Sequence, residues 1–258
     1  MNETLKIALI QSSLVWESPK ENRLLFSKKI DDVSKDVELI VLPEMFTTGF
    51  TMSPEHIDEK EGLETISWMK EKAVETGAAI IGSIIFNEKD NHYNRLYFIQ
   101  PDGTLDYYDK RHTFTLAGEH KKYKAGDRLA LVDFKGFRFC PLICYDLRFP
   151  VWSRNISDYD VLLYVANWPE PRINAWDTLL EARAIENMSY CVGVNRTGLD
   201  SNGNNYIGHS AVYDALGKQL AFSPKEEALI EVVISKSHIR DTRDKLRFLE
   251  DRDEFNII

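Results

Sequence analysis

Short apolar runs alternate with longer segments of helical period along most of this chain. Runs such as Leu39–Leu42 and Val161–Val165 are rich in Val, Ile and Leu, which is typical of strands buried on both faces of a sheet. Between such runs, segments such as 174–188 carry apolar residues four apart, as helices with one buried face do. The alternation predicts an α/β protein whose helices cover its sheets.

The predicted elements extend over almost the whole chain. The strands are Ile7–Ile10, Leu39–Leu42, Ala79–Phe86, Tyr93–Ile99, Thr104–Tyr108, Phe137–Ile143, Val161–Val165, Tyr190–Val194 and Leu229–Ile234. A hairpin turning at Gly217 is predicted between Val212 and Leu220, and helices are predicted around 26–33, 66–73 and 174–188. Because no repeat or linker rich in Pro or Gly interrupts this order, we expect one domain over 1–258, with a charged C-terminal tail from about residue 235.

The excess of acidic residues makes one class of partner, nucleic acid, unfavourable. The chain has 41 Asp and Glu against 32 Lys and Arg, a formal charge of -9, which would repel a polyanion. We therefore expect no nucleic acid partner. The first apolar stretch, Ile7–Ile10, is too short for a signal segment or a membrane span, so we expect a cytoplasmic protein with no membrane partner.

The chain has three cysteines, Cys140, Cys144 and Cys191. An odd number in a chain that we expect to stay in the cytoplasm is unfavourable for a disulfide framework and leaves room for a reactive thiol. Cys140 and Cys191 lie inside apolar strands and are expected to be small core residues. Because the sequence has no Cys-x-x-Cys and no cluster of His and Cys, we expect no structural metal site.

Three polar residues of complementary chemistry, Glu44, Lys110 and Cys144, each fall just after a predicted strand. Strand ends and the loops that follow them are where reacting groups usually gather in α/β proteins. A thiol with its ordinary pKa of about 8.5 is mostly protonated at neutral pH and needs a neighbour that takes its proton. A carboxylate and an ammonium supply this together. A Cys-His pair with His112 or His209 stays open as the alternative.

Three segments that contain these residues resemble, in the same order, the signature segments of the nitrilase superfamily. They are Leu42-Pro43-Glu44-Met45-Phe46, Asp109-Lys110-Arg111-His112 and Cys144-Tyr145-Asp146-Leu147-Arg148-Phe149-Pro150. With further matching segments, the resemblance extends from Lys6 to about Ile234. It implies a four-layer α-β-β-α sandwich, subunits that pair into a homodimer, and a reaction that uses no metal or organic cofactor.

The resemblance also implies a role for each matched residue. Cys144 would attack an amide carbonyl and form a thioester with release of ammonia, and Glu44 would carry the protons. Lys110 would stabilise the oxyanion beside the backbone N–H of Tyr145, and Glu119 would support the lysine. Taken singly, each residue also has a structural interpretation: a core thiol, a surface carboxylate, a lysine in a surface ion pair.

Within the superfamily, the amino-acid sequences of these segments are most similar to those of the omega-amidase branch. This branch implies a cysteine amidohydrolase acting on the terminal amide of short 2-oxo dicarboxylic acid monoamides, such as 2-oxoglutaramate or 2-oxosuccinamate. The alternatives are a carbamoylase, a nitrilase or a deaminated-glutathione amidase, since one triad serves all of them. A scaffold that binds a metabolite without catalysis is a further alternative.

The carboxylate of such a substrate requires a cation or several N–H donors in the pocket. Arg148 is the candidate, because a guanidinium can clamp a carboxylate with two parallel hydrogen bonds. Its alternative is an ion pair with Asp146 that only shapes the loop. Phe46, Phe114 and Trp168 are expected to wall the pocket.

Overall fold

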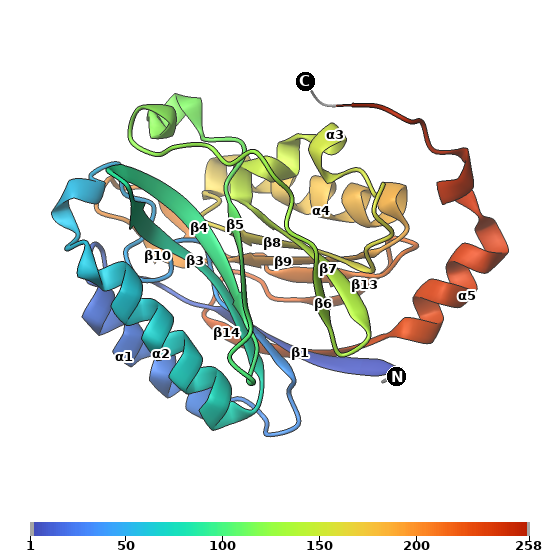
Figure 1. Cartoon of the computed structure of the whole chain (residues 1–258), viewed down its shortest axis with the longest axis horizontal. Coiled ribbons are helices and arrows are strands. Elements are labelled where there is room, and N and C mark those ends of the chain that lie inside the picture. Colours follow the sequence, from blue (N-terminus) through green and yellow to red (C-terminus); the bar gives the residue numbers. More distant parts are fainter. Residues whose placement is uncertain (1–2, 257–258) are drawn as a thin grey trace.

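The computed structural model describes residues 3–256, whose strands form two six-stranded sheets and one small ribbon (Figure 1). The first sheet has the order β14 (Ala228–Ser235), β1 (Thr4–Gln11), β2 (Leu39–Val41), β3 (Ala79–Glu88), β4 (Asn91–Ile99) and β5 (Leu105–Asp109). The second has the order β13 (Gln219–Phe222), β12 (Ala211–Tyr213), β9 (Tyr190–Asn195), β8 (Val161–Ala166), β7 (Phe137–Ile143) and β6 (Val132–Phe134). Strands β10 (Thr197–Leu199) and β11 (Asn205–Ile207) pair separately.

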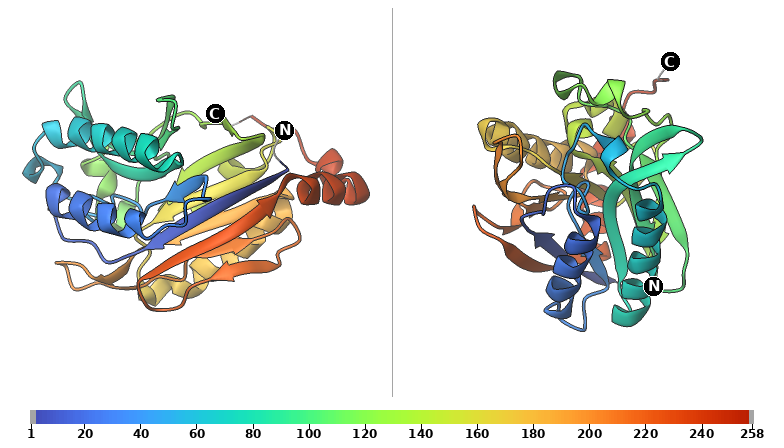
Figure 2. Two further views of the ribbon diagram at one scale, coloured as in Figure 1. Left: turned by 90° about the horizontal axis from the view of Figure 1, so that it is seen from below. Right: turned by 90° about the vertical axis from the view of Figure 1, so that its left-hand side faces the viewer.

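Helices cover the outer faces of the two stacked sheets. The α-helices are α1 (Pro19–Asp31), α2 (Lys60–Thr76), α3 (Pro150–Ser153), α4 (Ile173–Asn187) and α5 (Lys236–Leu246). Short 3₁₀ helices occupy Pro54–His56, Thr115–Ala117, Glu119–Lys121, Cys144–Arg148, Glu170–Arg172 and Phe248–Asp251. Helices α1 and α2 lie on one side of the molecule and α4 on the other (Figure 2). The expected four-layer α-β-β-α sandwich is therefore confirmed.

Strand β1 shows why its apolar run has no polar face. Its residues Leu5, Ile7 and Leu9 belong to the core cluster that joins the two sheets. Ala8 and Ile10 point the other way, into the cluster that includes the buried residues of α1 and α2. Because side chains alternate along a strand, a strand between another sheet and a helix layer must be apolar at every position.

Helix α4 lies very close to β9, and Gly193 makes this approach possible. A Cβ atom at Gly193 would lie 2.5 Å from Cδ1 of Leu180 and 2.8 Å from Cζ2 of Trp176. Both side chains are fully buried in the core cluster between the sheets and α4. A larger residue at this position would push the helix away from the sheet.

The predicted strands are all present, and the hairpin turns where expected, with Gly217 at φ 82°. The segment after Ser235, expected to be a charged C-terminal tail, contains helix α5 (Lys236–Leu246). Its start is capped by the Ser235 side chain, Ile239 is buried, and Arg243 donates to the carbonyl of Met188. This helix projects from one end of the sandwich (Figure 1). Among residues 3–256, no helix combines the length and the apolar character needed to cross a bilayer.

The strand directions bring the predicted polar residues to one end of the sandwich. Strands β2, β3 and β5 run the same way, because β3 is parallel to β2 and antiparallel β4 separates β3 from β5. Glu44 follows β2, Lys110 directly follows β5, and Cys144 directly follows β7 in the second sheet. The carboxyl ends of these strands carry the side chains described next.

Candidate active site

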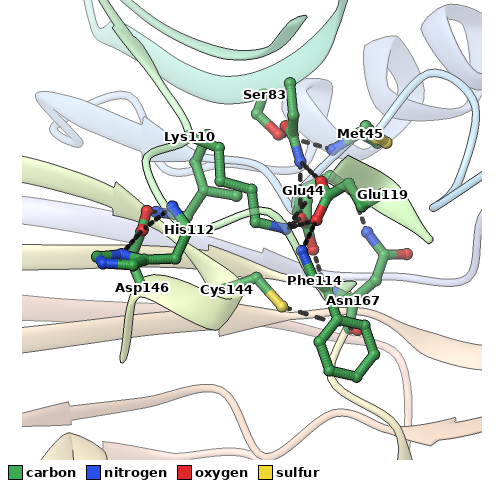
Figure 3. Close-up of polar contacts among 12 residues, drawn as sticks. Glu44, Met45, Ser83, Lys110, His112, Phe114, Glu119, Cys144, Asp146 and Asn167 are labelled. Carbon is green, nitrogen blue, oxygen red and sulfur yellow. Dashed lines mark hydrogen bonds and ion pairs between the residues drawn. The ribbon is translucent and has the colours of Figure 1, made fainter. Parts of the chain in front are cut away.

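Lys110 lies between two buried carboxylates (Figure 3). Its Nζ is 2.9 Å from Oε1 of Glu44, and 3.0 and 2.9 Å from Oε1 and Oε2 of Glu119. The ring of Phe50 covers the ammonium, with its centroid 4.9 Å from Nζ. Sequence reasoning grouped the lysine with both glutamates, and the structure places the three groups in direct contact.

Glu44 is held on both oxygens. Its Oε1 also accepts from Nδ2 of Asn94 at 2.8 Å, and its Oε2 accepts from the backbone N–H of Asn167 at 2.7 Å. The Asn167 side chain donates in turn to the carbonyl of Glu44 at 2.6 Å. Since a buried carboxylate is stable only with such donors, the carboxyl group has a defined orientation.

Cys144 occupies a sharp turn between β7 and the 3₁₀ helix Cys144–Arg148. Its φ is 44°, in the left-handed region that side chains with a Cβ rarely adopt. Such a conformation costs about 1–3 kcal/mol and occurs mainly where function requires it. The Sγ atom lies 3.9 Å from the carbonyl oxygen of Asn167. Figure 3 shows Cys144 beside the cluster of Glu44 and Lys110.

Asp146 holds this turn in place. Its Oδ2 accepts from the backbone N–H of Ile143 at 3.1 Å and from the hydroxyl of Tyr108 at 2.8 Å. Its Oδ1 accepts from the backbone N–H of His112 at 2.9 Å and lies 2.7 Å from Nδ1 of the same residue. One buried carboxylate therefore ties the segment around Cys144 to the segments on both sides of Lys110.

Burial and neighbouring charges change the acidity of the cluster. Burial, followed by the negative charge of Glu44, raises the pKa of the Cys144 thiol well above its ordinary range, against the opposing effect of Lys110. Burial lowers the pKa of the Lys110 ammonium, but the carboxylates of Glu119 and Glu44 outweigh it and raise the pKa. Burial also raises the pKa of Glu119, against Lys110. A thiol with a raised pKa becomes nucleophilic only when a base takes its proton.

A cavity of about 230 Å³ opens beside the thiol. Cys144 and Lys110 line it together with the aromatic side chains of Phe50, Phe114 and Trp168. This combination of a nucleophile, a cation and apolar walls is typical of a small-molecule site.

The chain also matches known proteins over nearly its full length. Residues 6–244 match the family Carbon-nitrogen hydrolase. This chain is a carbon–nitrogen hydrolase. Omega-amidase YafV of Yersinia enterocolitica is 44% identical over 99% of each chain, and the 2-oxoglutaramate amidase of Bacillus subtilis is 32% identical over 95% of this chain and 96% of that one. The CN-hydrolase superfamily protein XC1258 of Xanthomonas campestris, which carries an arsenic adduct in its active site, superimposes with a TM-score of 0.96 at 39% identity over 100% of both chains.

Two guanidinium groups line the cavity of this hydrolase. Arg148 lies over the ring of Trp168, 4.8 Å from its centroid, and Arg172 lies 5.3 Å from the centroid of Phe114. Among residues 3–256, neither arginine forms an ion pair with an acidic side chain. Their positive charges are therefore available to an anion that enters the cavity.

One expectation and one alternative about the surroundings of the site are wrong. Phe46 does not line the cavity. It is fully buried in the core, in contact with the rings of Phe26 and Trp68, because it follows β2 on the face covered by α1 and α2. Arg148 does not pair with Asp146, whose oxygens are already occupied within the chain.

The Cys-His alternative is not supported by the geometry of this hydrolase. His112 is bound to Asp146 and stacks on Phe149 at 3.6 Å, and His209 is bound to Asp177 at 2.9 Å. Neither ring lines the cavity beside Cys144. Within the described part of the chain, no cluster of three or more His, Cys, Asp or Glu side chains is arranged to hold a metal ion.

Sequence reasoning missed two residues that matter in the site. Asn94 interrupts the apolar strand Tyr93–Ile99, and a polar residue at a buried strand position needs a partner, so its position was a usable signal. Arg172 gave no such signal, because nothing local to Glu170–Arg172 indicates that the segment borders the cavity.

Proposed function

We propose that this carbon–nitrogen hydrolase is an omega-amidase that releases ammonia from the terminal amide of a short 2-oxo dicarboxylic acid monoamide. One observation carries the proposal: the thiol of Cys144 and the ammonium of Lys110 line a cavity that also presents the free guanidiniums of Arg148 and Arg172. The names of its relatives, an omega-amidase and a 2-oxoglutaramate amidase, support the same substrate class.

In the first half of the reaction, Glu44 accepts the proton of the Cys144 thiol as sulfur attacks the amide carbonyl carbon. The oxyanion that forms is stabilised by the ammonium of Lys110 and by the backbone N–H of Tyr145. Preorganised donors of this kind contribute about 3–4 kcal/mol each in acyl transfer. Glu44 then gives its proton to the amide nitrogen, the carbon–nitrogen bond breaks, ammonia leaves, and a thioester on Cys144 remains.

In the second half, Glu44 takes a proton from a water molecule that attacks the thioester carbonyl. The second oxyanion uses the same two donors. Collapse breaks the carbon–sulfur bond, and the proton held by Glu44 returns to the sulfur of Cys144. Glu119 keeps Lys110 in place throughout, because its two oxygens accept from Nζ at 3.0 and 2.9 Å. No metal or organic cofactor takes part in this scheme.

Arg148 and Arg172 would hold the substrate carboxylate at the far end of the cavity. A guanidinium forms bidentate hydrogen bonds with a carboxylate, and two of them favour an acid amide over a neutral one. Phe114 and Trp168 would wall the carbon chain between the carboxylate and the scissile amide. The 2-oxo acid amide would then place its terminal amide at Cys144.

The remaining expectations are also part of this proposal. We infer that 1–258 acts as one hydrolase domain, that it pairs into a homodimer, and that it works in the cytoplasm. Its formal charge of -9 supports the absence of a nucleic acid partner.

The test is ammonia release from a panel of 2-oxoglutaramate, 2-oxosuccinamate, a nitrile, a carbamoyl amino acid and a deaminated-glutathione amide. We expect the two 2-oxo acid amides to react fastest, and a higher rate with any of the others would overturn the branch assignment. Intact mass after brief exposure to substrate should show an acyl adduct that Cys144→Ala lacks. Cys191→Ala, which removes a fully buried core thiol, is the matched control and should still form it. A wild-type protein that releases no ammonia and forms no adduct would favour the scaffold alternative.

A further inference from the structure

Besides Lys110, the side chain of Asn94 contacts both carboxylates of the site. It lies on β4, is buried, and does not line the cavity. Its Nδ2 donates to Oε1 of Glu44 at 2.8 Å and to Oε1 of Glu119 at 3.4 Å. Both N–H bonds of the amide are therefore used within the cluster.

The backbone of Asn94 holds the third member of the cluster. Its carbonyl accepts from the backbone N–H of Lys110 at 3.0 Å, one step beyond the register pair Arg95 and Asp109. One residue of β4 therefore positions the lysine through its main chain and both glutamates through its side chain.

The other end of the amide is left without a partner. Oδ1 of Asn94 is buried and accepts no hydrogen bond within the described part of the chain. A buried acceptor without a donor is unfavourable. The reverse orientation of the amide would place Oδ1 against the carboxylate oxygens of Glu44 and Glu119. Two acceptors would then face each other without a donor, which is less favourable than one unpaired Oδ1. The amide therefore gives up one bond to supply two donors to the carboxylates.

We propose that Asn94 is a positioning residue whose NH₂ group keeps Glu44 and Glu119 as hydrogen-bond acceptors directed at Lys110. The inference rests on the proposed role of Glu44 as the base. Two carboxylates and one ammonium lie buried side by side, and their formal charges sum to minus one. The two N–H donors of Asn94 offset this excess without adding a charge that would compete with Lys110 for the oxyanion.

Among residues 3–256, several titratable groups face the cluster. They include Lys110 after β5, Glu119 in its 3₁₀ helix, Cys144 after β7, the phenol of Tyr123, which the charge of Glu119 influences, and the phenol of Tyr206, which interacts with Cys144. Loss of the two N–H donors of Asn94 should therefore affect the ionisation of these neighbouring side chains together. We expect the acid limb of the pH profile of kcat/KM to report it.

The test is Asn94→Leu, which keeps the size of the side chain and removes both donors. We expect the acid limb to move up by about one pH unit, because two donors to the carboxylates are lost. We expect kcat at neutral pH to fall severalfold, because Glu44 is no longer held in its orientation towards Lys110. KM should change less than twofold, because Asn94 does not line the cavity. Alkylation of Cys144 by iodoacetamide, followed by mass spectrometry, should show the same displacement along pH.

Asn155→Leu is the matched control. Asn155 is also fully buried, and its Nδ2 donates to the carbonyls of Tyr159 and Asn187, away from the cluster. This variant should lose stability without moving the acid limb. Should Asn94→Leu fail to fold, Asn94→Ser keeps one hydroxyl donor in a smaller side chain and should give a shift of the same sign.

Two outcomes separate the inference from the function on which it rests. An inactive Glu44→Gln together with an unshifted Asn94 profile would overturn the positioning role alone. A Glu44→Gln that keeps full activity would overturn the proposed base, and this inference with it.

Discussion

The ammonium of Lys110 lies 2.9 Å from Oε1 of Glu44, and the two side chains are 1% and 0% exposed. The residues are 66 positions apart in the sequence. Because Glu119 binds the same ammonium, one cation compensates two carboxylates. Stability and catalysis therefore depend on the same lysine.

Replacement of the lysine should affect both properties. Lys110→Met leaves two buried carboxylates without their cation, and we expect the free energy of unfolding to fall by about 3–5 kcal/mol in urea denaturation. Turnover should fall by at least about 100-fold, because an oxyanion donor is lost. Lys122→Met is the control: its ion pair with Glu55 is 42% and 53% exposed, so solvent screens it and its loss should change stability little. Equal stability losses in the two variants would contradict the charge argument.

The two arginines of the cavity should determine the preference for acids. Arg148→Met and Arg172→Met each remove a charged donor, a loss of roughly 1.5–3 kcal/mol in binding, so KM for 2-oxoglutaramate should rise about 10- to 100-fold. KM for a neutral amide of similar length should not change. Arg128→Met, on the exposed surface, serves as the control. A uniform effect on acidic and neutral amides would show that the arginines only shape the pocket.

The buried carboxylate of Asp146 should be essential for the turn that carries Cys144. Asp146→Ala leaves the hydroxyl of Tyr108 and the N–H groups of Ile143 and His112 without their acceptor. We expect a loss of at least about 3 kcal/mol in the free energy of unfolding, measured by chemical denaturation, and a lower kcat in the folded fraction. Asp133→Ala breaks only an exposed pair with Arg138, which solvent screens, and should change stability little. Unchanged stability of Asp146→Ala would refute this role.

Glu227 should contribute to the acid sensitivity of the fold. Partial burial raises its pKa, but hydrogen bonds from Lys29 and Ser13 outweigh this effect and lower the pKa from 4.5 to about 2. Between these values the unfolded state binds the proton and the folded state does not, so stability falls as the pH drops through this window. Glu227→Gln should therefore be less stable than wild type at pH 7, and the difference should narrow towards pH 2.

Thermal unfolding across pH 2–7 measures this effect. Glu226→Gln, which changes the exposed neighbour of Glu227 in the same loop, should follow the wild-type curve. A difference between Glu227→Gln and wild type that stays constant over the whole range would exclude the proposed linkage.

Local pattern was enough for most of the secondary structure. Strands such as β1, β2, β7, β8 and β9 were predicted because burial on both faces requires apolar residues along the strand, a property visible in a few consecutive residues. Strand β6 was not predicted, although its Val132 and Phe134 are buried in the core. Helix α5 was not predicted, since only Ile239 and Thr242 are buried on it. Its support comes from bonds such as that of Arg243 to Met188, which no local pattern reveals.

The sequence by itself determined the chemistry of the site: a thiol, two carboxylates and an ammonium, each following a strand or in the loop after it. Only the tertiary structure decided the left-handed turn of Cys144, the two donors of Asn94 and the position of Arg172 at the cavity. It also moved Phe46 from the pocket to the core. The reason is physical: residue type and strand periodicity are local, whereas distances between side chains on separate strands depend on how the two sheets stack.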